Sequence, residues 1–154
     1  MLKPIKTKTA RAIGGKFAIV ASKYNSRYVD AMLRAAQREL KRAGAKIQIV
    51  RVPGAYEIPV VAAKLARTSS PPLSAIICLG VILRGETTHA AHIGEAVSSA
   101  LMQVQITHEI PVIHEVLLLE NEAQARVRCL DKKHNRGTEA AQTALAMARV
   151  MKSL

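Results

Sequence analysis

The sequence predicts an α/β fold in which a parallel sheet is covered by helices. Short runs rich in Val, Ile and Leu alternate along the chain with segments whose apolar residues recur at helical spacing. The later strand-like runs are apolar on both faces, which is typical of strands buried in a parallel sheet. Alternation of this kind places the carboxyl ends of the strands at one edge, where we expect the functional loops.

The first strand and helix are predicted within residues 16 to 44. Lys16 to Ser22 is a β-rich run, and the helical pattern that follows it ends at Gly44, a residue that commonly terminates helices. The apolar positions of this helix are Val29, Met32, Leu33, Ala36 and Leu40. A second unit repeats this arrangement, with a strand from Lys46 to Val52, a turn at Pro53-Gly54 and a helix from Ile58 to Arg67.

The rest of the chain follows the Ser-Ser-Pro-Pro loop at 69 to 72 and continues the alternation. Two further strands are separated by one long helix, and two helical segments complete the fold. These elements are Ser74 to Leu83, His89 to Thr107, Ile110 to Leu119, Glu122 to Cys129 and Thr138 to Met151. We therefore expect a four-stranded parallel sheet with helices on both faces, a flavodoxin-like three-layer sandwich. Residues 1 to 12 fit no unit and are expected to form an arm that pairs with a neighbouring subunit.

Length and composition limit the class of protein. The 154 residues suit a single domain spanning 1 to 154, and 49% hydrophobic content argues against disorder. No apolar run is long enough to cross a bilayer and the amino terminus lacks the apolar core of a signal peptide, so a cytoplasmic protein is expected. Cys78 and Cys129 lie far apart in the sequence, which predicts two reduced thiols without a structural role.

The formal net charge of +12 raises the possibility of nucleic-acid binding. Such proteins usually interleave their basic residues with stacking aromatics, and this chain is only 3% aromatic. Lys and Arg are spread along the chain, a pattern more typical of solvated faces with one anion pocket. We expect nucleic acid to bind nonspecifically, and a basic packaging protein stays as an alternative that predicts salt-sensitive binding.

Four loops follow the predicted strands and are expected to meet at one edge of the sheet. They are 22 to 26, 52 to 57, 83 to 89, and the segment that carries Arg128 and Arg136. Each offers a group suited to binding a small molecule with an anionic end. These groups are the flat rings of Tyr24 and Tyr56, the hydrogen-bonding Asn25 and Glu57, the imidazole of His89 and the guanidinium of Arg128.

The segment from Gly80 to His89 is the most informative of these. An apolar run breaks at Gly85 and then presents two threonines and an imidazole where a helix begins. Backbone N–H groups at a helix amino terminus bind anions, although the same pattern also fits a plain helix cap followed by a histidine. His89 and His92 with Glu95 could be read as metal ligands, but no third ligand cluster accompanies them, so we expect no metal.

Several motifs in fixed order make the chain resemble a known family. They are Tyr-Asn at 24 to 25, Val-Pro-Gly-Ala-Tyr-Glu-Ile-Pro at 52 to 59, Leu-Gly-Val-Ile-Leu-Arg-Gly-Glu-Thr-Thr-His at 79 to 89, Pro-Val-Ile at 111 to 113 and Asn-Arg-Gly-Thr-Glu-Ala-Ala at 135 to 141. The chain resembles the 6,7-dimethyl-8-ribityllumazine synthases nearly end to end. The resemblance implies a transferase without cofactor that condenses 5-amino-6-(D-ribitylamino)uracil with 3,4-dihydroxy-2-butanone 4-phosphate in riboflavin biosynthesis.

The resemblance also implies roles for individual residues. Tyr24 would stack on the pyrimidine, and His89 would move protons between imine, enol and leaving group. The other contacts to ribitylaminouracil would come from Asn25, Ala55, Tyr56, Glu57, His114 and the backbone of Val81, Ile82 and Leu83. The phosphate would be held by Gly85, Glu86, Thr87, Arg128 and Arg136.

Some positions depart from the family pattern. His114-Glu115 stands where an aromatic residue and a glycine are common, and Arg136 replaces a usual lysine with a larger planar cation. Ala90-Ala91 follows His89 where bulkier residues are common. These departures motivate an alternative, a catalytically weak member of the family that binds flavin or lumazine or serves as a shell scaffold.

The resemblance implies an assembly as well. Active sites of the family lie between adjacent subunits of a pentameric ring, so a monomer is expected to be inactive. The segment from Arg128 to Arg136 carries no extra residues of the kind that block contact between rings, which favours a shell of sixty subunits with icosahedral symmetry. Riboflavin synthase is a candidate partner for such a shell.

Overall fold

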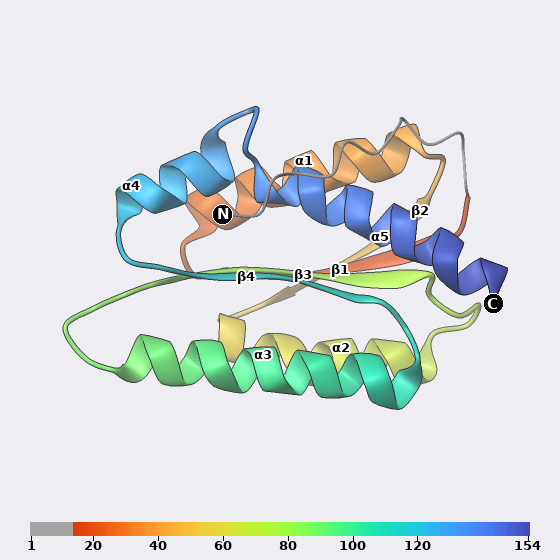
Figure 1. Cartoon of the computed structure of the whole chain (residues 1–154), viewed down its shortest axis with the longest axis horizontal. Coiled ribbons are helices and arrows are strands. Elements are labelled where there is room, and N and C mark those ends of the chain that lie inside the picture. The colour runs from red at the N-terminus through yellow and green to blue at the C-terminus, as the bar shows by residue number, and fades with distance from the viewer. Residues whose placement is uncertain (1–13) are drawn as a thin grey trace.

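The computed structural model describes residues 14–154, and the predicted arm at residues 1 to 12 lies outside the described residues. Four strands form one parallel sheet, as the alternating pattern predicted (Figure 1). Their order across the sheet is β2-β1-β3-β4. The strands are β1 (Lys16–Ser22), β2 (Lys46–Val52), β3 (Ala75–Leu83) and β4 (Val112–Leu119).

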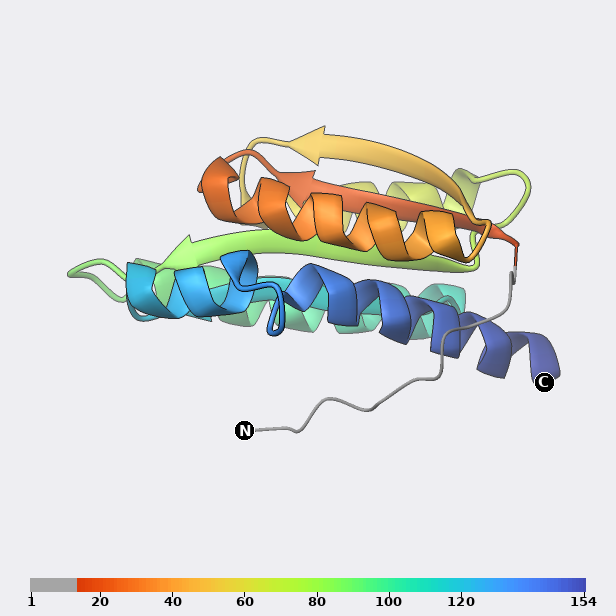
Figure 2. The same cartoon turned by 90° about the horizontal axis from the view of Figure 1, so that it is seen from above.

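Helices cover both faces of this sheet (Figures 1 and 2). One face carries α2 (Ile58–Thr68) and α3 (His89–His108), and the other carries α1 (Ser26–Arg42), α4 (Glu122–Ala125) and α5 (Arg136–Ser153). The predicted three-layer arrangement is therefore confirmed. A short 3-10 turn, η1 (Ala55–Glu57), precedes α2, and a π-helical turn, η2 (Arg126–Leu130), follows α4. None of the helices within residues 14–154 is long and apolar enough to span a membrane.

Alternation along β1 explains how one strand contributes to two apolar layers. Phe17 and Ile19 pack with the residues of α1 and α5, whereas Ala18 and Val20 pack with α2 and α3. Strand β3 is buried along most of its length on both faces. Each face of the sheet thus excludes water, as is usual for parallel strands.

Three elements have boundaries that differ from the predictions by two residues or more. Strand β4 begins at Val112 rather than Ile110, because Ile110 ends the α3 turn through a hydrogen bond to Gln105. The helix predicted over 122 to 129 is α-helical only to Ala125, after which the Asp131 N–H reaches back five residues to the Arg126 carbonyl. The last helix begins at Arg136, before the predicted Thr138, since the Asn135 side chain accepts the Gly137 N–H and caps it.

The strand order fixes where a ligand can enter. From β1 the chain moves outward to β2, and from β2 it crosses back to β3 on the other side of β1. The direction of winding therefore changes between β1 and β3. In open parallel sheets a crevice forms outside the carboxyl ends of the two strands at such a point.

A close approach between α5 and α1 depends on a glycine. A methyl group built on Gly137 would lie 2.0 Å from the Met32 carbonyl oxygen, which is backbone that cannot move aside. We expect Gly137→Ala to lower the free energy of unfolding by about 3 kcal/mol through overpacking. Chemical denaturation measures this loss. Gly94→Ala, where the new methyl meets its neighbours no closer than 3.5 Å, is the matched control and should change stability by less than about 1 kcal/mol; equal losses in both variants would contradict the packing argument.

Candidate active site

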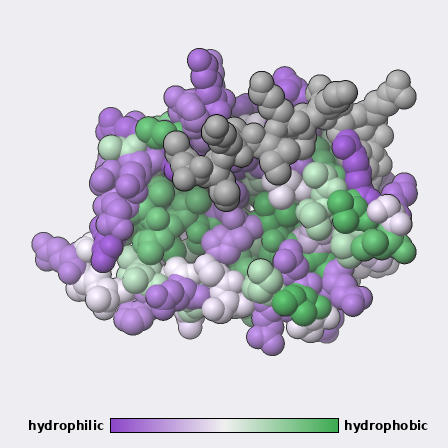
Figure 3. Space-filling model, in the orientation of Figure 1, coloured by the Kyte–Doolittle hydropathy of each residue, from purple (hydrophilic) through white to green (hydrophobic). Residues whose placement is uncertain are grey.

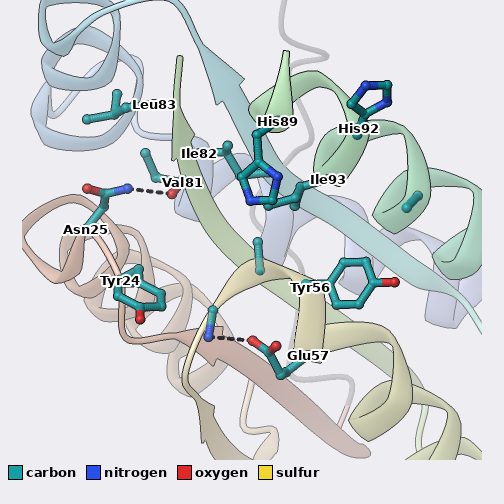
Figure 4. Close-up of a pocket in the computed structure, with 13 residues that line it drawn as sticks. Tyr24, Asn25, Tyr56, Glu57, Val81, Ile82, Leu83, His89, His92 and Ile93 are labelled. Atoms are coloured by element: carbon teal, nitrogen blue, oxygen red, sulfur yellow. Dashed lines mark hydrogen bonds between the residues drawn. The ribbon is translucent and has the colours of Figure 1, made fainter. Parts of the chain in front are cut away.

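A pocket of about 730 Å³ opens where the crevice is expected, at the carboxyl ends of β1 and β3 (Figure 4). The loop after β1, the turn η1, the end of β3 and the first turns of α3 supply its walls. It is lined by Tyr24, Asn25, Gly54, Ala55, Tyr56, Glu57, Val81, Ile82, Leu83, His89, His92, Ile93 and Ala96. Three of the four predicted loops therefore meet at one cavity within a single chain.

Asn25 ties the first of these loops to the sheet. Its backbone is in the left-handed region with φ of 56°, which asparagine tolerates better than most residues. Its side-chain Nδ2 donates a hydrogen bond of 2.8 Å to the Val81 carbonyl on β3. This bond fixes the position of Tyr24, whose ring is 72% exposed at the mouth of the pocket. A flat ring so placed is available to stack on a ligand.

The second loop is closed by a carboxylate. Glu57 Oε2 accepts a 2.8 Å hydrogen bond from the Gly54 N–H, as Figure 4 shows. A side chain at position 54 would approach the Glu57 carboxylate to 3.0 Å and the Tyr24 ring to 3.1 Å, so glycine suits this crowded turn. The bond leaves one Glu57 oxygen available to accept from a ligand hydroxyl. The Tyr56 ring, 63% exposed, stands beside it.

The third loop joins β3 to α3. Helix α3 begins at His89, as predicted, and Thr87 Oγ1 accepts the His89 backbone N–H at 3.4 Å. Gly85, Glu86 and Thr87 lie exposed just beyond the pocket lining. In Figure 4 the His89 ring projects over the cavity between the β3 end and η1, whereas His92 points away along α3. The positive end of a twenty-residue helix thus lies next to an imidazole.

The fourth predicted group does not line this pocket in a single chain. His114 lies on β4, where its Nε2 is 2.8 Å from Ser98 Oγ of α3. The half-buried Arg128 belongs to η2, and Arg136 begins α5. The expectation that all four loops surround one cavity therefore fails within one chain, because β4, η2 and α5 hold these three side chains outside the pocket lining.

Comparison with known proteins gives the family. The model of 6,7-dimethyl-8-ribityllumazine synthase matches residues 14–152. The chain belongs to this family. Similar proteins carry that same name in Desulfotalea psychrophila, at 41% identity over 94% of each chain, in Salinibacter ruber, at 38% over 92% of this chain and 91% of the relative, and in Stenotrophomonas maltophilia, at 37% over 90% of each.

Family membership confirms the resemblance drawn from the motifs, and with it an enzyme of the transferase class. The pocket adds residues that the motif comparison did not single out for binding, namely Gly54, His92, Ile93 and Ala96. The signal for His92 and Ile93 was present, since they follow His89 by three and four positions on the same helical face. Within residues 14–154 no three metal-binding side chains cluster together.

One ion-pair cluster in this protein was not predicted. Glu115 is buried on β4 and accepts two hydrogen bonds from Arg136, and Glu139 pairs with the same guanidinium. Burial raises the pKa of Glu115, and the Arg136 hydrogen bonds and the charges of Arg136 and Arg128 oppose that rise. Burial, together with the Glu115 charge, also raises the pKa of the Cys129 thiol to about 12, which keeps this thiol protonated and unreactive.

Proposed function

We propose that the protein condenses 5-amino-6-(D-ribitylamino)uracil with 3,4-dihydroxy-2-butanone 4-phosphate to give 6,7-dimethyl-8-ribityllumazine, with release of phosphate and water. This is the penultimate step of riboflavin biosynthesis. The observation that carries the proposal is a pocket at the switch between β1 and β3 in which exposed aromatic rings, a carboxylate and an imidazole meet beside a helix amino terminus. Family membership supplies the reaction.

The pyrimidine and its ribityl chain occupy the walls formed by the first two loops and β3. Tyr24 stacks on the ring, and the backbone of Val81, Ile82 and Leu83 meets its polar edge. Asn25 supports this contact through its bond to the Val81 carbonyl. Ala55, Tyr56 and Glu57 hold the ribityl hydroxyls, for which the second Glu57 oxygen is a suitable acceptor.

The phosphate binds at the amino end of α3. Backbone N–H groups of Gly85, Glu86 and Thr87 face the dianion, and the dipole of α3 favours negative charge at this end. The exposed Glu86 side chain can turn to solvent, so that its backbone alone meets the anion. A guanidinium from Arg128 would complete the site with two-point contact to phosphate oxygens.

The chemistry needs proton transfer and close positioning rather than a cofactor. The pyrimidine amine attacks the ketone of the four-carbon substrate, and loss of water gives an imine. Removal of the C3 proton and expulsion of phosphate from C4 leave an enol, which tautomerises to a ketone at C3. Attack of the ribitylamino nitrogen on this new carbonyl closes the ring with loss of water. His89 accepts and returns these protons. Holding two substrates in one pocket supplies much of the rate.

The remaining site residues reach the pocket from a neighbouring copy. Three of the site residues lie outside the pocket of their own chain, namely His114, Arg128 and Arg136. A head-to-tail ring of five subunits would place them against the pocket of the next subunit. The face that carries the β4 edge shows gathered apolar atoms (Figure 3). Exposed apolar side chains of α3, β4 and η2 are Met102, Ile106, Leu118 and Val127. Such a surface suits association with another subunit.

The short segment between Arg128 and Arg136 supports further assembly of rings into a sixty-subunit shell, with riboflavin synthase as a candidate partner within it. Sedimentation of the purified protein separates a pentamer from a shell of twelve pentamers. The cytoplasm is the compartment in which we place this assembly.

Turnover tests the proposed function. The purified assembled protein is mixed with both substrates, and the fluorescence of the lumazine product is followed against the uncatalysed reaction. Acceleration supports the enzyme. Lumazine or riboflavin binding without acceleration would instead support the weakly catalytic scaffold, and acceleration by none of the assembled forms would overturn the catalytic proposal.

A further inference from the structure

Arg136 is held by carboxylates on two sides. Its Nε donates to Glu115 Oε2 at 3.0 Å, and its Nη2 donates to Glu115 Oε1 at 2.8 Å. Its Nη1 donates to Glu139 on the same helix. The Glu115 side chain is only 7% exposed and that of Arg136 is 28% exposed. An arginine can bind a phosphate through the edge of the guanidinium that carries Nε and Nη2. In Arg136 this edge is therefore occupied by Glu115.

Arg128 acts on the same carboxylate through its charge. Its positive charge is among the influences that lower the pKa of Glu115, against the burial that raises it. The two cations that family resemblance assigns to phosphate therefore both act on one internal anion, Arg136 through direct hydrogen bonds and Arg128 through its charge. Arg128 and Arg136 together carry two positive charges, and Glu115 and Glu139 carry two negative charges when ionised. Little net charge is left to attract a phosphate dianion.

A carboxylate is costly at this position. The strand β4 is otherwise apolar from Val112 to Leu119 except for His114, and Glu115 is 5% exposed within it. Removing a carboxylate from water costs several kcal/mol, which a two-point ion pair offsets only in part. Arg136 also begins α5, where the helix dipole disfavours a cation. The Glu115 carboxylate compensates the unfavourable position of the Arg136 cation, but its own burial is unfavourable.

From this geometry we propose that Glu115 is an internal anion that occupies Arg136 and thereby lowers the affinity of the site for phosphate. Arg136 is then a positioning residue, which acts through Glu115, and Arg128 provides the guanidinium contact to the ligand. The inference rests on the proposed function in one respect, that these arginines face the phosphate end of a neighbouring pocket. It predicts faster loss of the phosphate product than a site with two unpaired cations would allow.

Calorimetric titration of assembled protein with inorganic phosphate tests this assignment. Glu115→Gln removes the charge and keeps the shape, and we expect phosphate to bind about fivefold to tenfold more tightly. Arg136→Gln leaves Glu115 facing Arg128, and the affinity should fall by at least about fivefold. The double variant Glu115→Gln with Arg136→Gln removes both partners and should bind phosphate within about twofold of the unaltered protein.

The double variant decides between positioning and direct contact. If Arg136 itself binds phosphate, the double variant loses about tenfold or more in affinity, and the inference is overturned. Unchanged affinity in Glu115→Gln would overturn it as well. The double variant leaves no charge at the buried position 115, and Glu139, which loses its Arg136 partner, is 29% exposed and can be solvated. The double variant should therefore fold even where a single variant does not.

Glu122→Gln is the control for overall charge. It makes the same change in net charge at an exposed carboxylate that pairs with Arg126 at 3.6 Å, and phosphate affinity should change by less than about twofold. An effect as large as that of Glu115→Gln would mean that phosphate affinity follows the net charge of the protein. It would refute the proposal that Glu115 competes with phosphate for Arg136. The titration uses phosphate alone, so it tests the role of Glu115 separately from the reaction. If the titration results contradict the role of Glu115 but the protein turns over its substrates, the proposed function stands. If the protein does not turn over its substrates, the proposed function is contradicted.

Discussion

Replacing His89 by alanine is expected to lower kcat by about a hundredfold. The imidazole stands at the first position of α3 and projects over the pocket (Figure 4). General acid and base catalysis typically contributes about a hundredfold to ten-thousandfold, and the lower figure fits a reaction that positioning also accelerates. Steady-state turnover with both substrates measures the loss.

His108→Ala is the matched control for that variant. His108 ends the same helix, at the other end of the molecule from the pocket, and its replacement should leave kcat within about twofold. A His89→Ala enzyme that keeps full kcat would show that water or another group carries the protons. The role of His89 would then reduce to shaping the helix terminus.

The second large effect is expected at Arg128. Replacing it by alanine should raise the KM for the four-carbon phosphate by about tenfold to a hundredfold, because a hydrogen-bonded guanidinium contact to a phosphate contributes about 1.5 to 3 kcal/mol. The KM for ribitylaminouracil should change little, since we propose that this substrate binds at the Tyr24 side of the pocket. Initial rates with each substrate varied in turn separate the two constants.

Arg126→Ala provides the comparison for Arg128. Both arginines belong to the π-helical turn η2, but Arg126 is exposed and pairs with Glu122 at 3.6 Å. Its loss should alter either KM by less than about twofold. Equal changes in KM in the two variants would indicate that the substrate is attracted by the overall positive charge of the surface and not by a specific contact with Arg128.

The pocket could be predicted from sequence because its residues follow their strands directly. Tyr24, Glu57 and His89 each stand within a few residues of a strand end, and a parallel sheet brings such ends together whatever the details of packing. The strands were predicted from long apolar runs, which identify a strand even when its first and last residues are not known. Boundaries were less certain, since the cap at Asn135 and the π-helical turn η2 depend on local hydrogen bonds.

The pairing of Glu115 with Arg136 could not be predicted in the same way. The two residues are separated by 21 positions and meet only because α5 packs over β4. A single carboxylate in an apolar strand signals that a cation must lie nearby, but it does not say which one. Sequence reasoning assigned Arg136 to phosphate through family resemblance, and the tertiary structure now gives that side chain a nearer partner.

The placement of Arg128 outside its own pocket leads to the central claim of this account, that each active site is built by two adjacent subunits. Mixing two inactive variants tests it. His89→Ala carries an intact Arg128, and Arg128→Ala carries an intact His89. Denaturing the two proteins, mixing them in equal amounts and refolding them together produces rings with randomly arranged subunits, with each variant refolded alone as the reference.

In a head-to-tail ring about a quarter of the sites would combine an intact His89 from one subunit with an intact Arg128 from the next. We therefore predict that the mixture recovers about a quarter of the activity of the refolded unaltered protein, measured at a phosphate-substrate concentration at which each variant alone is nearly inactive. A mixture no more active than the average of the separate variants would contradict the account, because both side chains would then have to act within one chain.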